Sequence, residues 1–106
     1  MNEVFVLETI EDRVKARLIK YLGRDDTGIR EDVLKLFLEG GTFTTGDVYK
    51  HLNEKKFDVS YRGVSAMVGL MNTRLGILSI DVTGDHNLYL LKEDYKPIVK
   101  AVLDNY

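Results

Sequence analysis

The 106-residue sequence contains no cysteine, no tryptophan and a single proline. The absence of cysteine excludes disulfides, thiolate zinc sites and cysteine nucleophiles. Long hydrophobic runs are also missing: no apolar stretch approaches the roughly 20 residues that cross a bilayer. No signal-peptide pattern opens the chain, so we expect a cytoplasmic protein that makes no contact with membranes.

A strong excess of basic charge is absent as well. Fifteen Lys and Arg residues stand against seventeen Asp and Glu residues, which leaves a formal charge of −2. This balance argues against a histone-like protein that binds nucleic acid through its total charge. With 44% hydrophobic and 30% charged residues, the composition is that of a globular protein. The length leaves room for one core, so we predict a single domain over residues 1–106.

Capping residues and apolar spacing predict five helices and one hairpin. Residues 1–8 form either a strand or a loose arm, and residues 9–22 form a helix capped by Thr9 and closed by a C′ glycine, Gly23. The second helix starts at Ile29 and is stopped by Gly40 and Gly41, and a short extended link at residues 42–43 follows it. The third helix starts at Thr44 or Thr45, and the fourth starts at Ser60, a good N-cap residue. Strands at residues 77–83 and 88–91 flank a turn at residues 84–87, and a last helix covers residues 94–105, with Pro97 in its first turn. The expected fold is mainly α with a small β-hairpin (α+β): a winged helix-turn-helix over residues 29–92 with extra N-terminal and C-terminal helices.

The middle of the chain carries a resemblance to known families. Residues 42–91 read TFTTGDVYKHLNEKKFDVSYRGVSAMVGLMNTRLGILSIDVTGDHNLYLL. This segment resembles the DNA-binding domain of ferric-uptake-regulator-type proteins, in which a helix like TTGDVYKHL leads to a helix with a Tyr-Arg pair, here Tyr61 and Arg62. The chain as a whole, and DVSYRGVSAMVGLMNTRLGIL above all, also resembles a small archaeal winged-helix family of unassigned function. The first resemblance implies DNA binding and transcription regulation. It does not imply metal sensing, because the chain has no cysteine and only His51 and His86.

The helix predicted over residues 60–75 is the expected recognition helix. Its apolar stripe of Val64, Val68, Met71 and Leu75 belongs to the core, so the opposite face is exposed. The candidate DNA contacts on that exposed face are Ser60, Tyr61, Arg62, Ser65, Asn72 and Thr73. Ser60 and Tyr61 at the helix N-terminus suit phosphate, Arg62 suits guanine, and Ser65 suits either base type, while small Ala66 and Gly69 permit close approach. Residues 59–75 contain two arginines and no carboxylate. The absence of acidic residues favours DNA contact, because a carboxylate there would repel phosphate. The same pattern also occurs in proteins that bind no DNA, where Ala66 and Gly69 would mark a helix or subunit contact.

The charge is unevenly distributed along the chain. Residues 47–75 hold five basic and three acidic residues, a net of +2, whereas residues 76–106 hold three basic and five acidic residues, a net of −2. Lys50, Lys55 and Lys56 are therefore candidate phosphate contacts, or else ordinary solvated surface. The predicted wing tip consists of Asp85, His86 and Asn87. Only His86 and Asn87 could contact a DNA groove, so we expect the wing to contribute little to DNA binding.

No pattern in the sequence indicates catalysis. Three of the four acidic pairs, at residues 11–12, 31–32 and 93–94, fall at expected helix starts, where negative charge favours the helix dipole. The fourth, Asp25 and Asp26, falls in a loop. Neither histidine has a nucleophile or carboxylate at a motif spacing, and no phosphate-binding glycine loop is present. We therefore expect no enzyme activity, no cofactor and no metal site.

Two functions of different classes remain. The first is a transcriptional regulator that binds double-stranded DNA, as a possible homodimer formed by the two terminal helices through Ile10, Val14, Leu18, Tyr21, Val99, Val102 and Leu103. Those residues would equally serve to cover the core of one chain. The second function is a winged-helix protein–protein interaction module or assembly subunit without DNA binding. The acidic wing and the apolar residues Met67, Leu70 and Met71 fit it, and exposure of Met67 or Leu70 would favour it.

Overall fold

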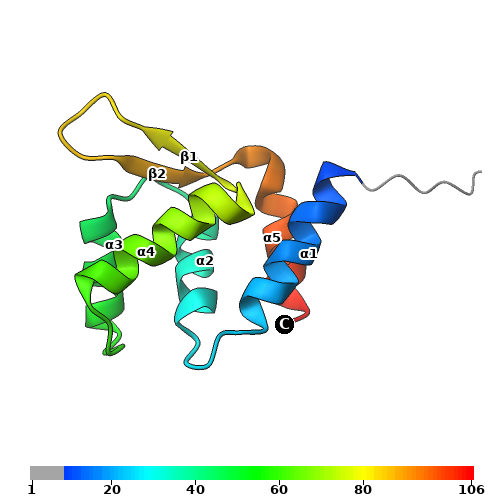
Figure 1. The fold of residues 1–106 in the computed structure, drawn as a ribbon, viewed down its shortest axis with the longest axis horizontal. Helices are drawn as coiled ribbons and strands as arrows, with labels where there is room; N and C mark the ends of the chain where they lie inside the picture. The colour runs from blue at the N-terminus through cyan, green and yellow to red at the C-terminus, as the bar shows by residue number, and fades with distance from the viewer. Residues whose placement is uncertain (1–8) are drawn as a thin grey trace, which may run out of the picture.

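The structure is a computed structural model that describes residues 9–106, so the element expected at residues 1–8 lies outside the described residues. Within these described residues, five α-helices and a two-stranded hairpin follow one another (Figure 1). The bounds are α1 (Ile10–Leu22), α2 (Ile29–Glu39), α3 (Thr45–Glu54), α4 (Tyr61–Leu70), the π-helical turn η1 (Met71–Leu75), β1 (Leu78–Asp81), β2 (Leu88–Leu91), the 3-10 turn η2 (Glu93–Tyr95) and α5 (Lys96–Asp104). The predicted class, mainly α with a small hairpin, is confirmed.

Side chains cap three of the predicted helices, Thr9 and Ser60 as expected and Thr44 at the predicted start of α3. Thr9 Oγ1 accepts a hydrogen bond from the Asp12 amide at 3.0 Å, and the Asp12 carboxylate accepts one from the Thr9 amide. Thr44 and Asp47 form the same reciprocal capping box at the start of α3. Ser60 Oγ accepts from the Gly63 amide at 3.0 Å. Each cap satisfies backbone donors that the first helical turn leaves without a partner.

Several predicted details of the helices and strands are wrong. Gly23 ends α1 with φ of −62°, so it is not the left-handed C′ glycine that we predicted. The helix expected over residues 60–75 ends at Gly76 as predicted, where φ of 67° suits glycine, but it changes from α to π geometry after Leu70. The first strand is shorter than expected, and the last segment begins as a 3-10 turn before α5 continues through Pro97 in its first turn.

The hairpin is joined by a third extended segment. β1 and β2 pair antiparallel, with Leu78 opposite Leu91 and Asp81 opposite Leu88. Phe43, in the link between α2 and α3, exchanges two 2.8 Å backbone hydrogen bonds with Tyr89. The predicted extended link is therefore confirmed at Phe43, and it fixes the start of α3 beside the hairpin.

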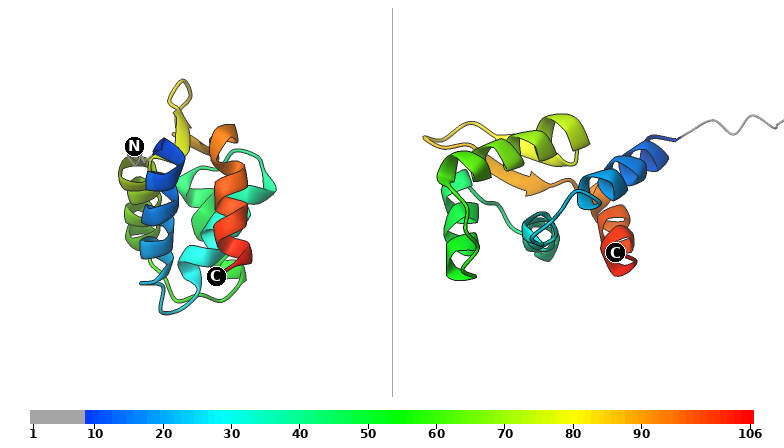
Figure 2. Two further views of the ribbon diagram at one scale, coloured as in Figure 1. Left: turned by 90° about the vertical axis from the view of Figure 1, so that its right-hand side faces the viewer. Right: turned by 60° about the horizontal axis from the view of Figure 1, so that its bottom comes forward.

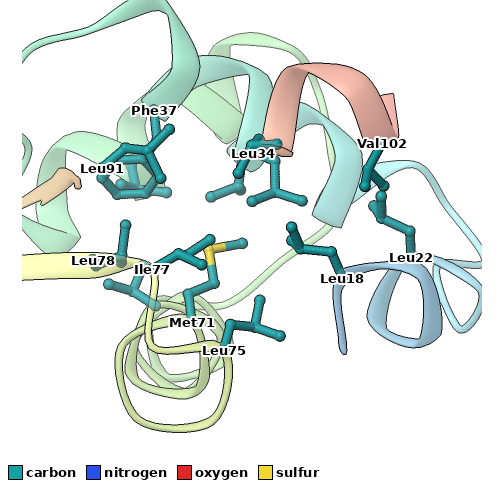
Figure 3. Close-up of a cluster of buried hydrophobic side chains, with 14 of the residues drawn as sticks. Leu18, Leu22, Leu34, Phe37, Met71, Leu75, Ile77, Leu78, Leu91 and Val102 are labelled. Atoms are coloured by element: carbon teal, nitrogen blue, oxygen red, sulfur yellow. The ribbon is translucent and has the colours of Figure 1, made fainter. Parts of the chain in front are cut away.

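One apolar cluster contains residues from all five helices and both strands. Figure 3 shows Leu34 of α2 and Met71 of η1 between Phe37 and Leu91 on one side and Leu22 and Val102 on the other. The buried members are Val14, Leu18, Leu22, Val33, Leu34, Phe37, Val48, Leu52, Val64, Val68, Met71, Leu75, Ile77, Leu78, Leu91, Val99 and Val102. This cluster confirms that the predicted stripe of α4 faces the core.

Helices α1 and α5 lie side by side, at the end of the molecule opposite the hairpin tip (Figures 1 and 2). Of the residues considered for dimerisation, Val14, Leu18, Val99 and Val102 are buried within this chain, and Tyr21 and Leu103 are half-buried. Ile10 alone among them is well exposed, at 64%. The structure thus supports the core-covering interpretation for these four buried residues, which have no surface to offer a second copy.

Candidate nucleic-acid interface

The outer face of α4 is exposed and free of carboxylates. Tyr61, Arg62, Ser65 and Ala66 are exposed, and Thr73 is exposed on the continuing π-helical turn. Asn72, expected on the same face, is half-buried. The face therefore presents hydroxyl groups, one arginine and small side chains.

A groove of about 390 Å³ joins the start of α4 to the hairpin tip and the start of α3. Tyr61 and Ser65 of α4 line it together with His86 and Asn87 of the turn between β1 and β2. The other lining residues are Thr44, Thr45, Gly46, Asp47 and Tyr89. The structure thus brings together candidate residues that are more than twenty positions apart in sequence, whereas Asp85 is not among the residues that line the groove.

Several groups in or near this groove are held by contacts within the chain. The Tyr61 ring packs edge-on against Tyr49, with 5.6 Å between the ring centroids. Asp47, the acidic lining residue, accepts a hydrogen bond from the Thr44 amide at 2.9 Å. On η1, which continues the exposed face of α4, the Thr73 hydroxyl donates to the Gly69 carbonyl at 2.9 Å. This hydroxyl proton is therefore not free to be donated to DNA.

The three candidate lysines lie apart from the groove. Lys55 Nζ is 2.7 Å from Asp32 Oδ1, and His51 Nε2 is 2.7 Å from Asp32 Oδ2, so Asp32 neutralises part of the charge there. Lys50 lines a separate hollow that also contains Asp47 and Glu54. Lys56 is exposed. None of the three lysines lines the groove that contains Tyr61 and Ser65.

Asp81, the last residue of β1, carries a firmly negative group. Asp81 Oδ1 accepts hydrogen bonds from the Thr83 hydroxyl at 2.6 Å and from the Thr83 amide at 2.9 Å. These hydrogen bonds hold the pKa of Asp81 below its usual value, so this carboxyl stays ionised at neutral pH. Next to it, Val82 is 65% exposed.

A second, basic cleft was not predicted from the sequence, because the charge was compared by segment only over residues 47–106. The cleft lies between α1 and the C-terminal end of the α4–η1 segment, and it is lined by Arg17, Lys20, Tyr21, Arg24, Arg30, Leu70, Arg74 and Leu75. A signal for its α1 side was present in the sequence: Arg13, Arg17, Lys20 and Arg24 recur every three or four residues, which places them along one helix face.

Within residues 9–106, no group of three or more His, Asp and Glu side chains is arranged to hold a metal ion. In the same part of the chain, no helix combines the length and hydrophobicity needed to cross a membrane.

The fold and these surfaces define a mainly helical protein in which a hairpin and an exposed helix face share one groove. The chain belongs to the DUF2551 family, described as proteins of unknown function, whose model matches residues 18–99. An uncharacterized protein from Archaeoglobus fulgidus is 43% identical over 93 residues, which cover 88% of this chain and 95% of that relative. No solved structure matches the chain at a significant level. These findings agree with the expected archaeal family of unassigned function.

Proposed function

We propose that this chain is a winged-helix DNA-binding protein, a transcriptional regulator that reads the major groove of double-stranded DNA with α4. The observation that carries the proposal is the groove in which Tyr61 and Ser65 of α4 meet His86 and Asn87 of the hairpin tip. The order α2, α3, α4 and hairpin, together with the extended segment at Phe43, is also the arrangement that the resemblance to ferric-uptake-regulator-type domains implies.

Each exposed group of α4 has a suitable partner on DNA. An α-helix fits the major groove, which is about 12 Å wide, and the exposed Arg62 can give two parallel hydrogen bonds to guanine. Tyr61, in the first helical turn, and Ser60, at the cap, lie near the positive end of the helix dipole, where phosphate binds favourably. The hairpin would bring His86 and Asn87 to the adjacent groove of DNA, and the ionised Asp81 at the end of β1 would weaken the attraction of this hairpin to phosphate.

Fluorescence anisotropy with mixed genomic DNA fragments, at about 50 and 200 mM salt, tests the proposal. We expect binding that weakens as salt rises, and a loss of roughly tenfold or more in affinity for Arg62→Gln. Lys15→Gln is the matched control, because it removes one positive charge from a hollow between α1 and α5, far along the chain from α4. Absent or salt-insensitive binding, with Arg62→Gln equal to wild type, would sink the proposal.

A second function, a protein-interaction module without DNA binding, is favoured by one observation. Leu70 of α4 is 42% exposed, and Ile80 and Val82 of the hairpin segment are 37% and 65% exposed. Exposed apolar side chains of this size suit a protein partner. If DNA does not bind, size-exclusion chromatography with light scattering of wild type and Leu70→Ser tests for a protein contact, beginning with self-association.

A further inference from the structure

The basic cleft between α1 and η1 is built from three separate parts of the chain. Arg17, Lys20 and Arg24 come from α1 and the residues after it, Arg30 comes from α2, and Arg74 comes from η1. The cleft has a volume of about 310 Å³. Small-molecule sites in proteins occupy roughly 300 to 1,000 Å³, so the cleft has room for a compact ligand.

Positive charge is concentrated among the residues that line this cleft, although the Asp25 carboxylate lies near enough to raise the pKa of Tyr21. The lining contains four arginines and one lysine and no carboxylate. Among the described residues, the salt bridges involve neither Arg17 nor Arg24 nor Arg74. Like charges gathered in one concave site repel one another and focus a positive potential that attracts anions.

Arg30 is fixed in the wall of the cleft by contacts with Tyr21. This residue lies in the first turn of α2, where the helix dipole disfavours a cation. It is held there because its guanidinium stacks 4.4 Å from the Tyr21 ring centroid and Nη1 donates to the Tyr21 carbonyl at 2.8 Å. Contacts at helix C-termini thus account for Lys20, Arg74 and Arg30 one at a time, but not for their meeting with Arg17 and Arg24 around one cleft.

The uncharged residues of the cleft add an aromatic side chain and an apolar wall. Tyr21 lines the cleft, but its hydroxyl is fully buried and does not reach the open space. Leu70 and Leu75 line the side formed by α4 and η1, and Leu70 is 42% exposed. A site with a few convergent polar groups on an apolar wall is typical of small-ligand binding.

We propose that this cleft binds a small ligand with several phosphate groups, of the nucleotide or inorganic polyphosphate class. One guanidinium group can donate two parallel hydrogen bonds to two oxygens of a phosphate. Four arginines around one hollow therefore suit a ligand with two or more phosphates. A DNA backbone is the competing occupant, but it gains little from a recess with leucine walls. The proposal does not depend on DNA binding by α4.

Isothermal titration calorimetry of the full chain tests the proposal, with ATP and sodium triphosphate as separate probes in metal-free buffer. We expect both to bind, and we expect Arg17→Gln combined with Arg74→Gln to weaken binding at least about tenfold. Tighter binding of ATP than of triphosphate would identify the nucleotide as the source of the phosphates, and equal binding would identify the polyphosphate. Lys15→Gln, which removes one charge from the separate hollow between α1 and α5, is the control and should bind within about twofold of wild type.

Two further measurements keep the outcome clear. The double variant Arg17→Lys with Arg74→Lys keeps the positive charge but loses the paired hydrogen bonds of the guanidinium groups. Its affinity should therefore lie between those of wild type and the glutamine variant. Circular dichroism verifies that each variant is folded. The proposal is overturned if neither probe binds wild type, or if the glutamine variant binds as tightly as wild type. Loss of DNA affinity in that variant, without any binding of ATP or triphosphate, would also overturn it and would assign the cleft to the DNA backbone. Loss of DNA binding in Arg62→Gln alone bears only on the function proposed for α4.

Discussion

At the scale of single residues, two tyrosines differ in what their hydroxyl groups contact. The Tyr21 hydroxyl is buried without a hydrogen-bond partner in the described part of the chain. Burial raises the pKa of Tyr21 to about 12, since Arg30 lowers it less than desolvation raises it, and Asp25 raises it further. The Tyr106 hydroxyl, in contrast, donates to the Leu22 carbonyl at 2.7 Å and ties the end of the chain to α1.

We therefore predict opposite effects of removing these two hydroxyl groups at pH 7. Tyr21→Phe should leave the free energy of unfolding unchanged or raise it slightly, because no hydrogen bond to the chain is lost. Tyr106→Phe should lower it by about 1 kcal/mol, because a carbonyl loses its donor. Urea unfolding followed by circular dichroism measures both. A loss in Tyr21→Phe as large as that in Tyr106→Phe would contradict the unpartnered state of the Tyr21 hydroxyl.

Alkaline pH gives a second test of Tyr21. Its folded pKa of about 12 exceeds the ordinary value of 10.0, so the folded state retains the proton longer than the unfolded state does. The resulting stability is complete below pH 10 and is lost as pH rises through 12, by up to about 2 kcal/mol. We expect Tyr21→Phe to lose less stability than wild type between pH 9 and pH 11, by urea midpoints. Parallel curves for the two proteins would contradict this account.

At the scale of elements, the start of α2 depends on a distant cap. Its N-cap residue, Gly28, has no side chain and adopts φ of 85°. The carboxylate of Asp25 takes over this role: Oδ1 accepts from the Arg30 amide and Oδ2 accepts from the Glu31 amide, each at 3.1 Å. One side chain thus satisfies two of the donors that a helix start leaves free.

Asp25→Ala should lower the free energy of unfolding by about 1 to 2 kcal/mol, because two capping hydrogen bonds are lost. Asp26→Ala is the matched control, since it removes the same charge at the next position from an exposed residue. Chemical denaturation of both variants gives the comparison. Equal losses would mean that loop charge, and not the cap, stabilises α2.

The contrast between Asp25 and the other caps shows which features sequence can predict. Thr9, Thr44 and Ser60 cap helices through contacts three residues away, so the local pattern was sufficient. Asp25 reaches donors five and six residues away across a loop, and no local pattern indicates that reach. The basic cleft was missed for the same reason, because Arg17 and Arg74 meet only after folding. The meeting of Tyr61 with His86 likewise depends on how the hairpin folds back onto α4.

At the scale of the whole molecule, the role of the terminal helices depends on tertiary packing. An apolar stripe on a helix is the same whether it faces a core or a partner, so the sequence left both interpretations open for Leu18 and Val99. In the folded chain both are fully buried, and α1 and α5 pack against each other and against α2. The two helices thus share a core with the helices and hairpin that form the candidate interface.

This shared core predicts that α1 unfolds together with the rest of the described chain. Leu18→Ala should lower the free energy of unfolding by about 3 kcal/mol, because it leaves a cavity among buried side chains. Ile19→Ala, the next residue of α1 and 55% exposed, should cost less than about 0.5 kcal/mol. Circular dichroism and tyrosine fluorescence should report the same urea midpoint in each variant, since one cooperative transition is expected of one core. If α1 and α5 were only an appended dimerisation layer, Leu18→Ala would instead separate the two signals, with an early loss of helix that leaves the hairpin and α4 folded.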